Sequence, residues 1–139
     1  IGTGTLCGAL FGLNRQLRGK PAGLRTCIIV VLATDAFVTL SQALTPELGD
    51  PSRVLAGVMS GVGFLGGVVI LARHSRVQGL TTAAMIWILA AVGAMIGLGQ
   101  YSAAIAITVI VLAIVTLVDH LEERGILPKK ESEPEQDQL

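Results

Sequence analysis

Apolar residues come in blocks whose lengths match the thickness of a lipid bilayer. Four blocks each approach the roughly 20 residues that a helix needs to cross about 30 Å of hydrocarbon, and a fifth, shorter block opens the chain. We therefore predict an all-α fold, a polytopic membrane helical bundle of about five transmembrane helices, the first of them truncated at its N-terminus. The predicted helices cover residues 1–13, 26–44, 54–72, 80–99 and 102–118.

Polarity divides the chain into two parts. Residues 1–118 form the predicted transmembrane domain, and residues 119–139 form a polar, acidic cytoplasmic tail that we expect to be partly disordered. Asp50 and Pro51 resemble a helix start, with Asp50 as the N-cap and Pro51 at the first helical position.

Composition excludes several classes of protein. Only 14% of the residues are charged, whereas a soluble domain carries roughly 25%. The formal net charge of zero provides no clustered basic surface for nucleic acid. Cys7 and Cys27 lack the spacing of a metal site or a disulfide framework, so we interpret them as small buried residues. The sequence contains no nucleophile and base at helical spacing, no CxxC and no P-loop, so we do not expect an enzyme.

The basic residues indicate an orientation. Nine of the ten fall in the first loop, the third loop and the tail, and the second loop contains only Arg53. Because Lys and Arg concentrate in cytoplasmic loops, we predict that the N-terminus is outside and the C-terminus is cytoplasmic. The nine are Arg15, Arg18, Lys20, Arg25, Arg73, Arg76, Arg124, Lys129 and Lys130.

Glycines recur at four-residue spacing. Residues four apart share a helix face, and small residues let two backbones approach closely in lipid. We predict a tight bundle whose close contacts lie either within one chain or between two. Gly61 to Gly66 also match the dinucleotide-binding pattern GxGxxG, but they lie inside an apolar helix, so we expect no cofactor. The packing glycines are Gly4, Gly8, Gly12, Gly57, Gly61, Gly63, Gly67, Gly93 and Gly97.

Asp35 lies in the middle of the second predicted helix, where an ionised group is costly and marks a candidate functional site. Thr39 and Gln42 follow at four and seven residues and share its face. One interpretation is a proton or cation site formed by Asp35, Thr39 and Gln42. The other is a neutral carboxyl group that is hydrogen-bonded across helices, with Ser60 or Thr108 as its partner.

Other polar residues give weak indications of metal binding. His74 and His120 lie apart, in basic and acidic surroundings, and do not form a metal site. Glu47 and Asp50 could attract a divalent cation, but two acids are few for magnesium. We therefore name no metal ligand.

Three motifs follow one another along the chain. They are Pro-Ala-Gly-Leu-Arg-Thr from Pro21, Ser-Gly-Val-Gly-Phe-Leu-Gly from Ser60, and Gly-Leu-Thr-Thr-Ala-Ala from Gly79. In this order they closely resemble the membrane domain of the MgtC/SapB family, and the resemblance extends over nearly the whole chain. The residues that match the family motif are Arg15, Arg25, Arg53, Gly61, Phe64, Gly66, Thr81 and Thr82.

The resemblance implies a bacterial inner-membrane protein of about five helices. For the best-known members it implies a link to growth under magnesium limitation and to survival inside host cells, through restraint of the F-type ATP synthase rather than magnesium transport. Those members also have a soluble C-terminal domain, so this chain resembles the short members. It departs from the family pattern at Asn14, Gln16, Cys27, Gly57 and Gln78.

Three functions remain open. We favour a non-enzymatic regulator or accessory partner of a membrane complex, whose partners are the lipid bilayer and another membrane protein, or a second copy of the chain. The first alternative is a transporter or channel for protons or divalent cations such as Mg²⁺, with Asp35 as its site. The second alternative is a structural accessory subunit that only fills space in a larger membrane assembly.

Overall fold

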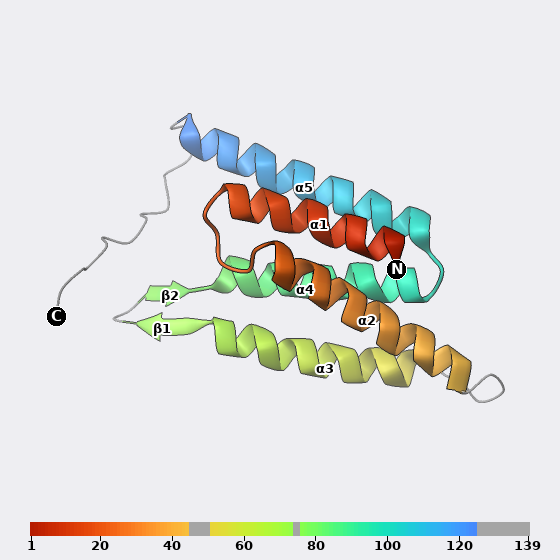
Figure 1. The fold of residues 1–139 in the computed structure, drawn as a ribbon. Helices are drawn as coiled ribbons and strands as arrows, with labels where there is room; N and C mark the ends of the chain where they lie inside the picture. The colour runs from red at the N-terminus through yellow and green to blue at the C-terminus, as the bar shows by residue number, and fades with distance from the viewer. Residues whose placement is uncertain (45–50, 74–75, 125–139) are drawn as a thin grey trace.

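Five helices and one short hairpin make up the computed structural model, which describes residues 1–44, 51–73 and 76–124 (Figure 1). Four of the helices are long and apolar enough to cross a membrane, and the first is shorter, with 16 residues. The predicted all-α helical bundle is therefore confirmed. The elements are α1 (Gly2–Leu17), α2 (Leu24–Leu44), α3 (Pro51–Val69), β1 (Leu71–Arg73), β2 (Arg76–Gln78), α4 (Leu80–Gly97) and α5 (Tyr101–Glu123).

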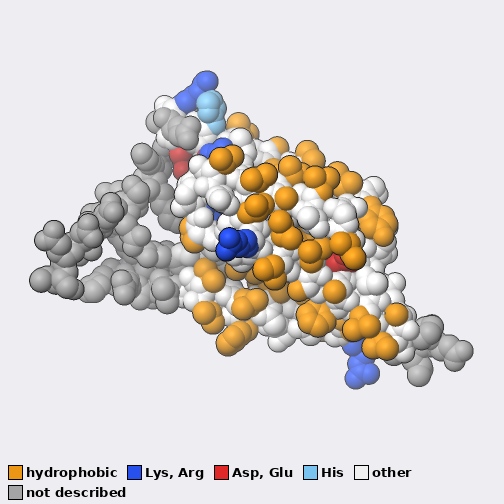
Figure 2. All heavy atoms as spheres, in the orientation of Figure 1, with side chains coloured by type: hydrophobic (Ala, Val, Ile, Leu, Met, Phe, Trp, Pro, Cys, Tyr) orange, Lys and Arg blue, Asp and Glu red, His pale blue; other side chains and the backbone are white. Residues whose placement is uncertain are grey.

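Consecutive helices run in opposite directions, so the first loop, the hairpin and the end of α5 lie together at one end of the bundle (Figure 1). We call this the basic end, because it holds the first-loop basic residues and Arg124, whereas Arg53 lies at the opposite end of α3. Figure 2 shows hydrophobic side chains over the middle of the bundle and charged side chains mainly toward its ends. The side of the membrane that the basic end faces stays a prediction.

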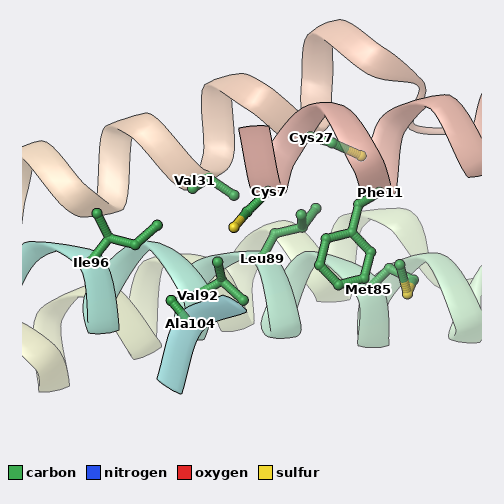
Figure 3. Packing of buried hydrophobic residues seen from close by; sticks show 9 residues of the cluster. All are labelled: Cys7, Phe11, Cys27, Val31, Met85, Leu89, Val92, Ile96 and Ala104. Atoms are coloured by element: carbon green, nitrogen blue, oxygen red, sulfur yellow. The ribbon is translucent and has the colours of Figure 1, made fainter. Parts of the chain in front are cut away.

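Helix α4 is the centre of the bundle. It carries no charged residue, contacts the four other helices, and 56% of its apolar span is buried, compared with 11% for α3 and for α5. A helix that is apolar on all sides is expected at such a buried position. Side chains from α1, α2, α4 and α5 meet in one apolar cluster (Figure 3). The cluster consists of Cys7, Phe11, Cys27, Val31, Met85, Leu89, Val92, Ile96 and Ala104.

The hairpin between α3 and α4 was not predicted. The apolar block suggested a helix to residue 72, but α3 ends at Val69, and β1 pairs antiparallel with β2, with Leu71 opposite Gln78. Gly79 has a φ of 81°, and a Cβ at this position would overlap the carbonyl oxygen of Val69. Glycine therefore allows the chain to turn back against the end of α3 and to begin α4.

The ends of two other helices also differ from the sequence prediction. Helix α1 continues to Leu17, past the predicted end at residue 13, and α5 continues to Glu123, so the predicted tail begins as helix. Helix α3 begins at Pro51, the position expected for proline in a helix start. Its expected cap, Asp50, lies outside the described residues.

The glycines on α1 and α4 lie at helix crossings within the chain. A Cβ built on Gly8 would lie 2.8 Å from Ile28 Cα, and one on Gly12 would lie 2.5 Å from Leu24 Cα. On α4, a Cβ on Gly93 would lie 2.5 Å from the carbonyl oxygen of Val31. Because such distances are too short for any side chain, glycine permits α2 to contact α1 and α4 backbone to backbone. Gly4 and Gly97 belong to the same two crossings.

The glycines on α3 lie in different surroundings. A Cβ built on Gly57, Gly61 or Gly67 would have no neighbouring atom within 4 Å. Only Gly63 and Gly66 face another helix, where a Cβ would lie 3.7–3.9 Å from ring atoms of Trp87 on α4. The same four-residue spacing therefore produces tight packing on α1 and an unoccupied face on α3.

Candidate functional site

Arg15 is the centre of a polar cluster at the basic end. Its side chain is only 5% exposed, and its Nη2 donates a hydrogen bond to Thr82 Oγ1 on α4 at 2.9 Å. Its Nε donates to the carbonyl oxygens of Pro21 and Ala22, at 2.9 and 3.2 Å, and Nη2 also donates to Pro21. One guanidinium therefore joins the end of α1, the first loop and the start of α4, which suits its rigid fork of donors.

The first loop turns tightly around Arg15. The carbonyl oxygen of Arg15 accepts hydrogen bonds from the backbone amides of Arg18 and Lys20, at 3.2 and 3.0 Å. Gly19 and Ala22 both have a φ of 61°. This left-handed conformation costs an alanine roughly 1–2 kcal/mol, so the hydrogen bond from Arg15 to the Ala22 carbonyl holds a strained residue in place.

A second polar contact joins α1 and the first loop to α5. Arg18 Nη1 lies 2.9 Å from Asp119 Oδ2, and Lys20 Nζ lies 3.8 Å from Asp119 Oδ1. One helical turn earlier, Asn14 Nδ2 donates to Thr116 Oγ1 at 3.3 Å. Sequence reasoning placed Asp119 only in the tail and missed these contacts, for which no sequence spacing gave a signal.

Asp35 lies inside the bundle, in the middle of α2, and is 8% exposed. Its Oδ1 accepts a hydrogen bond from Thr39 Oγ1 at 3.2 Å. The backbone nitrogen of Ile1 lies 3.7 Å from Asp35 Oδ2, and a Cβ built on Gly4 would lie 3.8 Å from the same oxygen. The carboxylate therefore faces the beginning of α1. Gln42 does not join it, because its Nε2 donates to the carbonyl oxygen of Gly97 at 2.7 Å.

The expected partners of Asp35 on other helices are wrong. The hydroxyl of Thr108 donates to the carbonyl oxygen of Ala104 on its own helix, at 2.7 Å. Ser60 lies exposed on α3. The hydrogen-bond donor is instead Thr39, one turn further along α2, as the shared helix face allows.

The motif residues separate into buried and exposed groups. Arg15 and Thr82 are buried and bonded to each other, and Gly66 is buried against α4. The exposed motif residues are Arg25, Arg53, Gly61, Phe64 and Thr81.

The weaker metal-binding residues do not form a site in the described part of the chain. His120 lies exposed in the last turn of α5, and Glu47, Asp50 and His74 lie outside the described residues. No group of three or more His, Cys, Asp and Glu side chains among the described residues is arranged to hold a metal ion.

Four apolar helices long enough to span a membrane, among them the buried and uncharged α4, define a polytopic α-helical membrane protein. Residues 1–124 match the model of the MgtC family. The chain belongs to the MgtC family.

Relatives of known name cover most of the chain. It is 40% identical over 119 residues to "Protein MgtC" of Salmonella typhimurium strain 14028s, a match that covers 86% of this chain and 51% of that protein. It is 41% identical over 125 residues to "Putative magnesium transporter YhiD" of Escherichia coli K12, covering 85% and 58%. "Protein MgtC" of Brucella abortus is 41% identical over 113 residues, covering 81% and 47%. The chain thus spans about half the length of these relatives, and no solved structure matches it.

Proposed function

We propose that this chain is a non-enzymatic regulator or accessory partner of a membrane complex, and that it binds this complex through its basic end. The observation that carries the proposal is the hydrogen bond between two motif residues, Arg15 and Thr82. This bond and those to Pro21 and Ala22 fix the first loop against α1 and the start of α4. A preformed loop at one end of a rigid bundle suits binding to a partner, because little conformational entropy is lost on binding.

The charges of the basic end support a partner with an acidic surface. Asp119 holds Arg18 and approaches Lys20, whose side chain is still 47% exposed, and Arg124 at the end of α5 is also exposed. Complementary charge steers and orients a partner. The resemblance to the MgtC/SapB family makes the F-type ATP synthase the first complex to examine. In this proposal the protein lies in the bacterial inner membrane with its basic end in the cytoplasm.

Co-purification tests the proposal. The protein is purified in mild detergent at native expression, with Lys20→Glu and Arg124→Glu combined and with Arg53→Glu as the control at the opposite end. We expect a defined complex to accompany the wild type and the control and to be lost from the double variant. A protein that is always recovered alone, or a double variant that retains its partner, would contradict the proposal. If the double variant loses the complex and the activity of that complex stays the same, the purely structural accessory subunit is favoured.

A second function has a specific observation in its favour. Asp35 places a carboxylate at mid-depth of an apolar helix with Thr39 as its donor, and buried acids in spanning helices commonly mark ion pathways. The name of the Escherichia coli relative also refers to magnesium transport. Proteoliposomes with dyes for H⁺ and Mg²⁺ test this function with Asp35→Asn, which keeps the shape of the side chain. Asp119→Asn removes an equal charge at the end of α5 as the control. If the chain transports ions, the wild type and the control should show a flux of H⁺ or Mg²⁺ that Asp35→Asn loses. A wild type without flux excludes transport.

A further inference from the structure

A groove between α2 and α3 is a feature that the proposed function leaves unused. Its volume is about 670 Å³, and apart from Thr34 its lining side chains are apolar or glycine. Helix α2 contributes Ile29, Ala33 and Phe37, and α3 contributes Gly57 and Gly61 with their apolar neighbours. The two helices diverge toward the basic end (Figure 1). Because its lining residues lie within these two spanning helices, the groove lies at the depth of the hydrocarbon.

We propose that this groove binds one acyl chain of an anionic glycerophospholipid, whose phosphate is held at Arg25. Arg25 is exposed and makes no ion pair with another described residue. It precedes Ile29 by one helical turn, about 6 Å along the axis, on the same side of α2. The exposed hydroxyl of Thr26 precedes Val30, another lining residue, in the same way. A long basic side chain at the end of an apolar groove is the arrangement that binds lipid phosphates between membrane helices.

The charge at its end favours an acyl chain over a helix from a second copy. From Ile29 to Phe37 the groove extends about 12 Å along α2. An apolar helix in the groove would leave the Arg25 guanidinium without an anion, whereas a phospholipid supplies one. A flexible hydrocarbon chain fits and covers the backbone that Gly57 and Gly61 leave open.

The test counts bound lipids by native mass spectrometry. The delipidated chain is mixed either with phosphatidylglycerol or with phosphatidylcholine of identical acyl chains. Near a membrane surface the attraction between one basic residue and an anionic lipid corresponds to about a fivefold preference in binding. We expect Arg25→Gln to lose this preference while binding both lipids. Arg124→Gln removes an exposed arginine at the end of α5, which does not line the groove, and should keep the preference. Because Arg25 is exposed, Arg25→Gln leaves the packing intact.

The acyl-chain site is tested separately by filling the groove. Gly61→Leu places a side chain in the groove, and Gly67→Leu makes the same change on α3 outside the lining; neither glycine has an atom within 4 Å of a built Cβ. We expect Gly61→Leu to lose the retained lipid of either headgroup and Gly67→Leu to behave as wild type. Gly57→Leu serves as a second groove variant if the first does not fold.

Three results would overturn the proposal. They are an unchanged lipid count in the groove variants, a preference for phosphatidylglycerol that survives Arg25→Gln, and a change from dimer to monomer in Gly61→Leu with lipid binding unaffected. The last result would identify the groove as an interface between two copies.

Discussion

Replacing Arg15 tests whether the polar cluster at the basic end holds the bundle together. Arg15→Met keeps the apolar stem and removes the guanidinium. The buried hydrogen bond from a charged donor to Thr82 contributes about 1.5–3 kcal/mol, and the part-buried bonds to Pro21 and Ala22 about 0.5–1.5 kcal/mol each. Because removing the guanidinium also removes the cost of burying it, we expect a net loss of about 2–4 kcal/mol in the free energy of unfolding.

Arg15→Lys separates charge from geometry. One ammonium group cannot reach acceptors on the first loop and on α4 at once, whereas the guanidinium fork does. We expect this variant to lose about half as much stability as Arg15→Met, although it keeps the charge. A merely electrostatic role would leave its stability unchanged.

The assay is reversible unfolding of the purified protein in detergent micelles by added denaturing detergent. A double-mutant cycle of Arg15→Met with Thr82→Val should give a coupling energy of about 1–3 kcal/mol. Arg25→Met is the control, since that side chain is exposed, and it should lie within about 0.5 kcal/mol of wild type. Additive effects in the cycle, or an Arg15 variant as stable as the control, would refute the reasoning.

Three further predictions use the same assay. Gly8→Ala should lower the free energy of unfolding by about 1–3 kcal/mol, because its Cβ would meet the α2 backbone, whereas Gly61→Ala should leave it unchanged. Equal effects of the two variants would contradict the packing. Ala22→Gly should stabilise by about 0.5–1 kcal/mol by removing left-handed strain, and a destabilised variant would show that the loop needs the methyl group. Asp119→Ala should lower the free energy of unfolding by about 0.5–1.5 kcal/mol at low salt and by less at high salt, since its ion pair with Arg18 is partly exposed. An effect independent of salt would exclude that ion pair.

The sequence predicted the helices well because a long apolar block has few other structures open to it in lipid. The same reasoning failed where the block continued past Val69, since a short apolar run does not distinguish helix from strand. What ends α3 is the hairpin and the left-handed Gly79, and both depend on how the chain returns to begin α4.

The contacts of the candidate sites were less predictable. Thr39 follows Asp35 by four residues, so the shared face could be read from the sequence. A partner on another helix depends on how that helix is rotated about its axis, which spacing does not give; Ser60 and Thr108 were therefore misassigned. Arg15 and Thr82 are 67 residues apart, and only the family motif marked both of them.

The packing of α2 helps to compare a binding protein with a transporter or channel. A path past Asp35 would require α1 or α4 to separate from α2, because the carboxylate faces the beginning of α1 and the groove lies on the other side, toward α3. Those two crossings are backbone contacts that even one methyl group at Gly8 or Gly93 would disrupt, and opening them by 0.5–1 Å already loses about a quarter to a half of each contact's attraction. Helix α3, by contrast, is little buried, and its groove can take a ligand without breaking any such crossing. Ligand binding in the groove therefore costs this bundle less packing energy than opening a path past Asp35 would.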